Sequence, residues 1–237
     1  MMSYKNKVDS YIKDMSDYFI NWENKDLHKD ASFIKDGVIN PKTYFSQEHR
    51  ILFILKEAYT KDRSFNLCEW LDYEGEKIRR IWDRVSEWTR MIYGVLDGEI
   101  IPFKKDSGFR NNGNEYLRRI AVLNIKKSNG TSISKYEDLK KYAREDSVEL
   151  FKQLEICDPT IIICGNTGDY LKDIVPEWCD LRQESDVEKE HFIYRMTLNG
   201  HNVVVINYWH PANQYPDILN YYGLFNICKV AFGDVKK

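Results

Sequence analysis

Four short, nearly continuous apolar runs constrain the fold of this chain more than any other feature of its sequence. The runs span residues 50–55, 119–125, 160–164 and 202–207, and each has the length of a strand. A run without alternating polar positions is typical of a strand that is covered on both faces, as in a parallel sheet. The runs therefore predict buried strands with further structure packed on either side.

Segments with helical spacing separate these runs. Apolar residues recur every three or four positions in 8–22, 78–96, 142–154 and 219–230, which places one apolar stripe along a helix. A shorter helix is predicted over 168–176. Strands that alternate with helices predict an α/β fold, a three-layer α/β/α sandwich with a central, mostly parallel sheet.

Turn and loop signals divide the remaining sequence. Asn199-Gly200 separates apolar runs at 192–198 and 202–207, and this dipeptide suits the positive φ angles of a tight hairpin turn. Residues 23–47 and 98–114 are rich in polar and turn-forming residues. We therefore predict one hairpin and two long loops.

The composition is that of an ordinary folded domain. Of 237 residues, 12 are Gly, 6 are Pro and 14% are aromatic, which excludes a disordered or collagen-like chain. No repeat or linker interrupts the order of elements, so we predict a single domain over 1–237, with 1–47 as an N-terminal helix and loop extension. The net charge of −2 argues against binding nucleic acid through a broad basic surface.

The cysteines and the apolar runs indicate the compartment. The number of cysteines is odd, and no two have the spacing typical of zinc sites. No apolar run approaches the roughly 18 residues that span a membrane, and the first residues lack an apolar signal core. We therefore predict a cytoplasmic protein with no membrane partner, no metal and no cofactor, and with reduced thiols at Cys68, Cys157, Cys164, Cys179 and Cys228.

Hydrogen-bonding residues follow the predicted buried strands. Glu57 comes just after the first run, Asn124 lies at the end of the second, residues 165–168 follow the third and His210 follows the last. Ligands of open α/β sheets bind at the carboxyl ends of parallel strands. Strands also end in polar residues where the chain returns to solvent, so a surface carboxylate at Glu57 and a strand cap at Asn124 are the simpler interpretations.

The order of these motifs resembles that of the uracil-DNA glycosylase superfamily. ILFILKEAYT resembles its first motif, an apolar strand running into a short loop, and IAVLNIKK resembles a strand that ends in a base-reading Asn followed by Lys. LFKQLEICDPTIIICGN is similar to a helix, a break and a strand ending in Gly. VVVINYWHPAN is similar to the last strand and its His-Pro-Ser motif, with Ala212 in place of the serine. The resemblance extends over residues 50–232.

This resemblance implies roles for five residues. His210 would donate a hydrogen bond to a base carbonyl and stabilise the negative charge that develops on the leaving base. Glu57 would orient or activate the attacking water, and Asn124 would read the Watson–Crick edge of the base. Tyr59 or Phe65 would stack on the extruded base. Together they form the predicted catalytic and base-binding site.

The resemblance also implies a local rim for nucleic acid. Lys126 and Lys127 follow the predicted base-reading Asn, and Asn213 to Tyr215 would lie in a loop that enters the DNA groove, with Tyr215 as a wedge. Further arginines are interpreted as solvated helix charges, or as a phosphate track if they share this rim: Arg79, Arg80 and Arg84.

Two departures bear on the activity. Lys56 replaces the glycine that opens the first motif, and Tyr59-Thr60 replaces the Pro-Gly that lets the backbone approach the base. A Lys and a Tyr occupy space that a flipped base needs. No cysteine lies where some branches of the superfamily bind an iron–sulfur cluster, so no cluster is predicted.

The sequence therefore favours a DNA glycosylase-like protein, an N-glycosylase that cleaves or recognises uracil or a related base in nucleic acid. The alternative is a non-catalytic protein of the same fold that binds a nucleotide or phosphate ligand, with the backbone N–H groups of residues 165–168 around the anion. A cysteine hydrolase using Cys164 and His210 ranks below both, because Ile162 stands where its nucleophile turn needs glycine.

Overall fold

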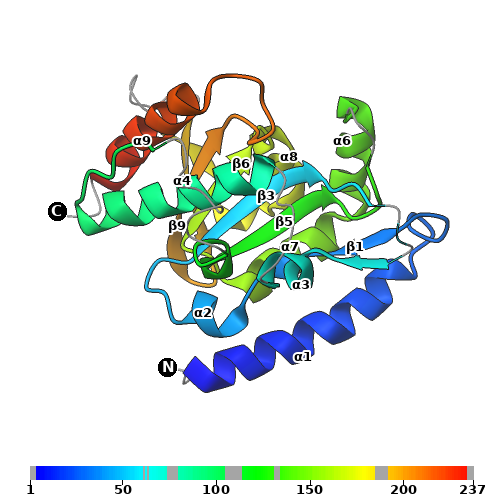
Figure 1. Ribbon diagram of the computed structural model, residues 1–237. Helices are drawn as coiled ribbons and strands as arrows, with labels where there is room; N and C mark the ends of the chain where they lie inside the picture. The colour runs from blue at the N-terminus through cyan, green and yellow to red at the C-terminus, as the bar shows by residue number, and fades with distance from the viewer. Residues whose placement is uncertain are drawn as a thin grey trace.

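The computed structural model describes residues 4–60, 62, 64–73, 80–104, 114–130, 134–184 and 192–233. Strands and helices alternate over most of this chain (Figure 1). The strands are β1 (Phe33–Lys35), β2 (Gly37–Val38), β3 (Ile51–Glu57), β4 (Ser64–Asn66), β5 (Ile120–Lys126), β6 (Ile161–Gly165), β7 (Arg182–Gln183), β8 (Ile193–Leu198) and β9 (His201–Tyr208). The helices are α1 (Tyr4–Glu23), α2 (Pro41–Phe45), α3 (Leu67–Asp72), α4 (Arg80–Asp97), α6 (Tyr136–Glu145), α7 (Ser147–Cys157), α8 (Gly168–Ile174) and α9 (Asp217–Gly233), with 3₁₀ helices η1 (Leu117–Arg119) and η2 (Glu177–Cys179).

A seven-stranded sheet forms the centre of the molecule, in the order β2-β5-β3-β6-β9-β8-β7. Its four central strands, β5, β3, β6 and β9, are parallel. β2 pairs with β5 at one edge, and β8 and β7 extend the other edge, all through antiparallel pairs. The prediction of an α/β fold with a mostly parallel sheet is confirmed at this level.

Helices cover both faces of the sheet because successive side chains of the buried strands point in opposite directions. In β3, Leu52 and Ile54 belong to a core that includes side chains of α1, α2, α6, α7 and α8. Ile51, Phe53 and Leu55 belong to a second core with α3, α4 and α9. The continuous apolar run of β3 thus supplies both cores, with α1 and α4 on opposite sides of the sheet in Figure 1.

The order of the strands in the sheet indicates where a ligand could bind. After β3 the chain crosses to β5 on one side, and after β6 it continues to β9 on the other side. Such a reversal opens a crevice at the carboxyl ends of the strands, where the crossovers diverge. The segments that follow β3, β5 and β9 all lie at this edge.

The predicted hairpin is confirmed. β8 and β9 pair up to Leu198 and His201. Asn199 and Gly200 between them have φ angles of +49° and +77°. Two consecutive positive φ angles are what a two-residue hairpin loop requires, and Asn-Gly adopts them more easily than other dipeptides.

Other local predictions were wrong in part. The segment 23–47, predicted as a loop, contains β1, β2 and α2. The helix predicted through 142–154 is two helices, α6 and α7, which meet at Asp146. Residues 78 and 79, with which the predicted helix 78–96 begins, lie outside the described residues. Within the described ranges, no helix is long and apolar enough to span a membrane.

A buried ion pair joins the N-terminal segment to the sheet. Asp36 lies between β1 and β2, and Lys127 follows β5; both side chains are 0% exposed, with Lys127 Nζ 2.5 Å from Asp36 Oδ1. The same carboxylate accepts hydrogen bonds from Gln153 Nε2 (2.9 Å) and from the main-chain N (2.8 Å) and Nδ2 (3.0 Å) of Asn124. Burial lowers the pKa of Lys127, and the Asp36 carboxylate opposes that shift. The Trp22 ring, 5.1 Å from Nζ, also packs against the cation.

Replacing Lys127 tests the weight of this pair. We expect Lys127→Met to lower the free energy of unfolding by about 3–5 kcal/mol, because Asp36 would keep its place without its counter-charge. Urea denaturation measures the loss. Lys141→Met, at a side chain 56% exposed, is the matched control and should change stability by less than about 0.5 kcal/mol. Similar stabilities for the two variants would contradict the account.

Candidate functional site

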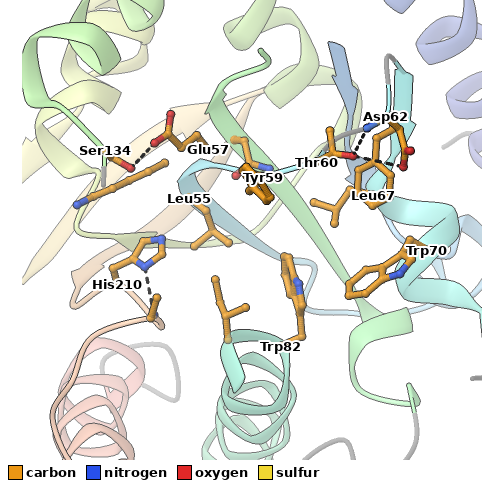
Figure 2. A pocket seen from close by; sticks show the side chains of 16 residues that line it. Leu55, Glu57, Tyr59, Thr60, Asp62, Leu67, Trp70, Trp82, Ser134 and His210 are labelled. Carbon is orange, nitrogen blue, oxygen red and sulfur yellow. Dashed lines mark hydrogen bonds between the residues drawn. The ribbon is translucent and has the colours of Figure 1, made fainter. Parts of the chain in front are cut away.

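A cavity of about 630 Å³ opens at the carboxyl edge of the parallel strands (Figure 2). This volume lies within the range of about 300–1,000 Å³ that small-molecule sites occupy. Its walls come from the segment after β3, the ends of β5 and β9, and the helices α3 and α4. The lining residues are Leu55, Lys56, Glu57, Ala58, Tyr59, Thr60, Asp62, Phe65, Leu67, Trp70, Ile81, Trp82, Asn124, Ser134, His210 and Ala212.

The structure brings together the five residues that the sequence placed in a base-binding site. Glu57, Tyr59, Phe65, Asn124 and His210 all line this one cavity. They come from segments up to about 150 residues apart, and they meet because parallel strands end at the same edge of the sheet. Their roles toward a ligand stay predictions.

Aromatic rings of α3 and α4 face Glu57 and His210 across the cavity (Figure 2). Figure 2 shows Trp70 and Trp82 facing the cavity from α3 and α4, opposite Glu57 and His210. Phe65 packs beside Trp70, with ring centroids 6.3 Å apart. A flat ligand with apolar faces and hydrogen-bonding edges suits such walls.

Glu57 is held inside the cavity wall and is not the solvated surface carboxylate of the simpler interpretation. Its side chain is 6% exposed. Ser134 Oγ donates to Glu57 Oε1 at 2.6 Å, and Lys126 Nζ lies 3.7 Å from Oε2. Gly130 closes over it: a Cβ atom there would lie 2.5 Å from Glu57 Cδ, so only glycine fits without a shift. The carboxylate therefore has a fixed orientation.

His210 presents one ring nitrogen to the cavity as a donor. The main-chain N–H of Ala212 donates to His210 Nδ1 at 3.1 Å, so the neutral ring carries its proton on Nε2. Burial, with the positive charges of Lys56 and Arg84 nearby, lowers the pKa of His210 to about 4. At neutral pH this side chain is thus an uncharged N–H donor.

The amide of Asn124 is oriented by the buried Asp36 carboxylate. Asn124 Nδ2 donates to Asp36 Oδ2 at 3.0 Å, and the main-chain N–H of the same residue donates to the same oxygen. This contact uses one of the two N–H groups of the amide and fixes the orientation of the amide plane, in which Oδ1 is the acceptor for a ligand. Asn124 lines the cavity, and its side chain bonds to the Asp36 carboxylate.

The two lysines predicted on a nucleic-acid rim are turned to other partners. Lys127 is wrong as a rim residue, because its side chain is fully buried against Asp36. Lys126 is 12% exposed, and its Nζ lies 2.6 Å from Asp138 Oδ2 as well as near Glu57. Both positive charges are therefore neutralised within the protein and supply no phosphate track.

Asn213 and Tyr215 lie outside the cavity lining, in the loop between β9 and α9. Asn213 Nδ2 donates to the main-chain oxygen of His210 (2.8 Å) and to Asn220 Oδ1 (2.7 Å), so it braces the loop. Tyr215 is 55% exposed. Its ring centroid lies 4.7 Å from that of Trp209, also an exposed side chain. Of the two predicted rim residues Asn213 and Tyr215, Tyr215 is the one with an exposed side chain that a large partner could contact.

The arginines predicted as solvated charges or as a phosphate track differ in their exposure. Arg80 is more than half exposed and pairs with Asp217 at 3.2 Å. Arg84 is buried, so its interpretation as a solvated charge is wrong. Arg79 lies outside the described residues.

The turn after β6 is occupied by the protein's own groups. The main-chain N–H of Gly168 donates to Asn207 Oδ1 at 3.1 Å, and Thr167 Oγ1 donates to the oxygen of Ile54 at 2.8 Å. Cys164 is fully buried, which raises its pKa to about 12. The geometry thus argues against both an anion-binding turn and a thiolate nucleophile.

A Ser-His-Asp chain elsewhere in the molecule has triad distances but no access to solvent. His28 Nδ1 lies 2.8 Å from Ser128 Oγ, and His28 Nε2 lies 2.8 Å from Asp146 Oδ2. All three residues are buried. Burial alone would raise the pKa of Asp146, but hydrogen bonds from His28 and Lys25 lower it. These hydrogen bonds connect the segment after α1 to the junction of α6 and α7, and they stabilise the fold.

Three residues that shape the site carry no sequence signal of that role. Ser134 lies in a polar turn without periodicity, Trp82 belongs to the apolar stripe of a helix, and Asp36 lies in the segment predicted as a loop. Ser134 and Asp36 act through partners distant in the sequence, Glu57 and Asn124. Sequence patterns report on residues that are close in the sequence and therefore cannot reveal such contacts.

The sequence matches no protein-family model and no curated protein. In the part of the chain that the structure describes, no group of three or more His, Cys, Asp or Glu side chains could hold a metal ion. The case for a function therefore depends on the cavity itself.

The titration of His210 tests the state assigned to this side chain. We expect its NMR signals to stay constant from pH 8 to 5 and to titrate at about pH 4. Since the ordinary pKa is 6.5, the unfolded chain binds a proton between these pH values that the folded chain does not, so stability should fall as the pH falls from 6.5 to 4. A midpoint near 6.5 would show a solvated ring and contradict the assignment.

Proposed function

We propose that this protein binds a nucleobase in the cavity at the carboxyl edge of the sheet and is a DNA glycosylase-like protein that cleaves or recognises a modified base such as uracil. One observation carries the proposal: a neutral imidazole donor, a fixed carboxylate and an oriented amide converge opposite aromatic walls. This combination supplies both an edge-reading surface and the groups for breaking a glycosidic bond.

The polar groups select a base with a carbonyl and an N–H on its edge. His210 Nε2–H would donate to the carbonyl, and Asn124 Oδ1 would accept from the N–H. Uracil presents this pair of groups on its Watson–Crick edge. The faces of the ring would pack against Trp70 and Trp82. Lys56 and Tyr59 line the cavity and leave about 630 Å³ free, so they do not fill the space of a base.

The same groups can support cleavage. When the bond between the sugar carbon and the base nitrogen breaks, its electron pair goes to the base, and the His210 N–H stabilises the resulting negative charge on the carbonyl oxygen. Glu57 would orient a water toward the sugar carbon and accept its proton as the new C–O bond forms. A fixed, nearly neutral cavity favours this charge separation because its dipoles need no reorientation.

Contact with a strand would rest on exposed aromatic rings. Trp209 and Tyr215 are 40% and 55% exposed and lie near the two ends of the loop that carries His210. Aromatic rings stack on bases of any sequence. This contact needs no cluster of lysines and is compatible with the net charge of −2.

Recognition without cleavage is the second candidate, and the environment of Glu57 favours it. Ser134 already donates to one carboxylate oxygen, and Lys126 lies near the other. These partners lie where a water would otherwise hydrogen-bond to the two carboxylate oxygens. A base would then be bound and read but not released.

Oligonucleotides that carry uracil, hypoxanthine or another altered base, in single- and double-stranded form, test the proposal. We expect abasic sites with the unmodified protein and a loss of about 10²–10³ in rate for His210→Ala, the usual cost of removing one such donor. His201→Ala, at the opposite ends of the strands, is the matched control and should keep full activity.

Glu57→Gln separates the two candidates. Under cleavage, this variant should still bind the oligonucleotide but lose about 10²–10⁴ in rate, whereas Glu48→Gln, at an exposed position, should lose nothing. Binding without abasic sites in the unmodified protein would favour recognition. If no oligonucleotide binds, and His210→Ala behaves as the unmodified protein does, both candidates fail.

A further inference from the structure

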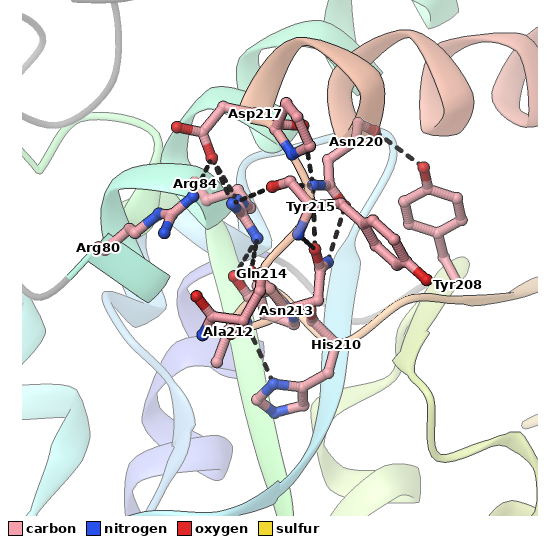
Figure 3. A network of polar contacts seen from close by, with 12 residues as sticks. Arg80, Arg84, Tyr208, His210, Ala212, Asn213, Gln214, Tyr215, Asp217 and Asn220 are labelled. Carbon is pink, nitrogen blue, oxygen red and sulfur yellow. Dashed lines mark hydrogen bonds and ion pairs between the residues drawn. The ribbon is translucent and has the colours of Figure 1, made fainter.

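Arg84 is a buried cation that contacts the loop carrying His210 (Figure 3). It projects from α4, and its side chain is 4% exposed. Its Nη1 donates to the main-chain oxygens of Pro211 (2.7 Å) and Asn213 (3.1 Å), and its Nη2 donates to that of Tyr215 (3.4 Å). Nε donates to Asp217 Oδ1 at 3.0 Å, and Nη2 forms an ion pair with the same oxygen. One guanidinium therefore connects three residues of the loop with the first residue of α9.

The contact with Pro211 is the informative one. The carbonyl of Pro211 and the N–H of Ala212 belong to the same planar peptide group. Arg84 donates to the oxygen of this group, and the N–H on its other side donates to His210 Nδ1 at 3.1 Å. A charged donor on the carbonyl fixes the orientation of the peptide plane and strengthens its N–H as a donor.

The remaining hydrogen bonds of the loop do not involve the 211–212 peptide, which is why Arg84 can determine its orientation. Asn213 returns to the oxygen of His210 through its main-chain N (2.9 Å) and its Nδ2 (2.8 Å), and it pairs with Asn220 at the start of α9. These bonds close the loop but leave the 211–212 peptide to Arg84. The positive charge also disfavours protonation of the nearby imidazole, which helps to lower the pKa of His210.

We propose that Arg84 is a positioning residue that sets the tautomer and the orientation of His210 through the 211–212 peptide. The chain of contacts runs from the guanidinium to the Pro211 carbonyl, from the Ala212 N–H to His210 Nδ1, and from there to the Nε2 proton at the cavity. The inference deepens the proposed function, in which His210 Nε2–H meets the base. It concerns the free protein, however, and can be tested without a substrate.

The direct test is nitrogen NMR of the His210 ring in the unmodified protein. The two ring nitrogens have distinct shifts when only one is protonated, and a coupling across a hydrogen bond reports the contact between Ala212 N and His210 Nδ1. We expect a protonated Nε2, an unprotonated Nδ1 and a detectable coupling. A ring protonated on Nδ1 would overturn the proposal before any variant is made.

Variants then test the part of Arg84. Arg84→Lys keeps the charge but loses the planar fork, and Arg84→Gln loses both. In each folded variant, we expect the two ring nitrogens to move toward averaged shifts. In Arg84→Gln, which also loses the charge, the titration midpoint should rise above about 4, by only part of the full shift because burial and Lys56 still lower the pKa of His210. Arg80→Gln is the matched control, since Arg80 pairs with the same Asp217 but is more than half exposed, and it should change neither measurement.

The outcomes separate the two proposals. If folded Arg84→Lys and Arg84→Gln proteins keep the tautomer and the midpoint of the unmodified protein, Arg84 does not position His210. If the unmodified protein neither binds nor cleaves any base, the proposed function fails while the NMR result stands. If both hold, Arg84→Lys should lower the rate of base release by about tenfold to a hundredfold with little change in binding, because a small misplacement acts mainly on the transition state.

Discussion

The rest of this structure depends on the buried carboxylate of Asp36 and the hydrogen bonds that it accepts. It places a negative charge in the interior, and such a charge is tolerated only when donors surround it. The donors are Lys127 Nζ, Gln153 Nε2, and the main-chain N and Nδ2 of Asn124. These donors come from the end of β5 and from α7, so the sheet and one helical layer must be in register before the charge is neutralised. The N-terminal segment is thereby fixed to the sheet edge that carries the cavity.

The same arrangement recurs at three polar groups of the cavity. Asp36 fixes the amide of Asn124, Ser134 fixes the carboxylate of Glu57, and the Ala212 N–H fixes the ring of His210. In each pair, the partner hydrogen-bonds to one polar atom of the side chain and thereby fixes the direction of the other. Donors and acceptors that are held in place before a ligand arrives lose little entropy on binding and suit the stabilisation of a developing charge.

Much of the fold could be predicted from the sequence because its signals are local. The apolar runs became β3, β5, β6 and the hairpin strand β9, and the Asn199-Gly200 turn has the positive φ angles that its residues favour. The meeting of Glu57, Asn124 and His210 at one cavity followed from topology, since parallel strands end at a common edge.

The predictions that were wrong concern side chains whose partners are distant in the sequence. Lys126 and Lys127 are indistinguishable in sequence, but Asp36, 91 residues away, draws Lys127 inward. Arg84 reads as one more surface charge on a helix until its partners, at least 127 residues away, are known.

The central claim is that the three polar groups and the aromatic walls form one base-binding site. A crystal structure of the protein with an oligonucleotide that carries a non-cleavable uracil nucleoside tests it most directly. We expect the extruded ring in the cavity, with a carbonyl oxygen within hydrogen-bond distance of His210 Nε2, the imino N–H at Asn124 Oδ1 and the sugar facing Glu57. A cavity that stays free of the base while the oligonucleotide binds at another surface would contradict it.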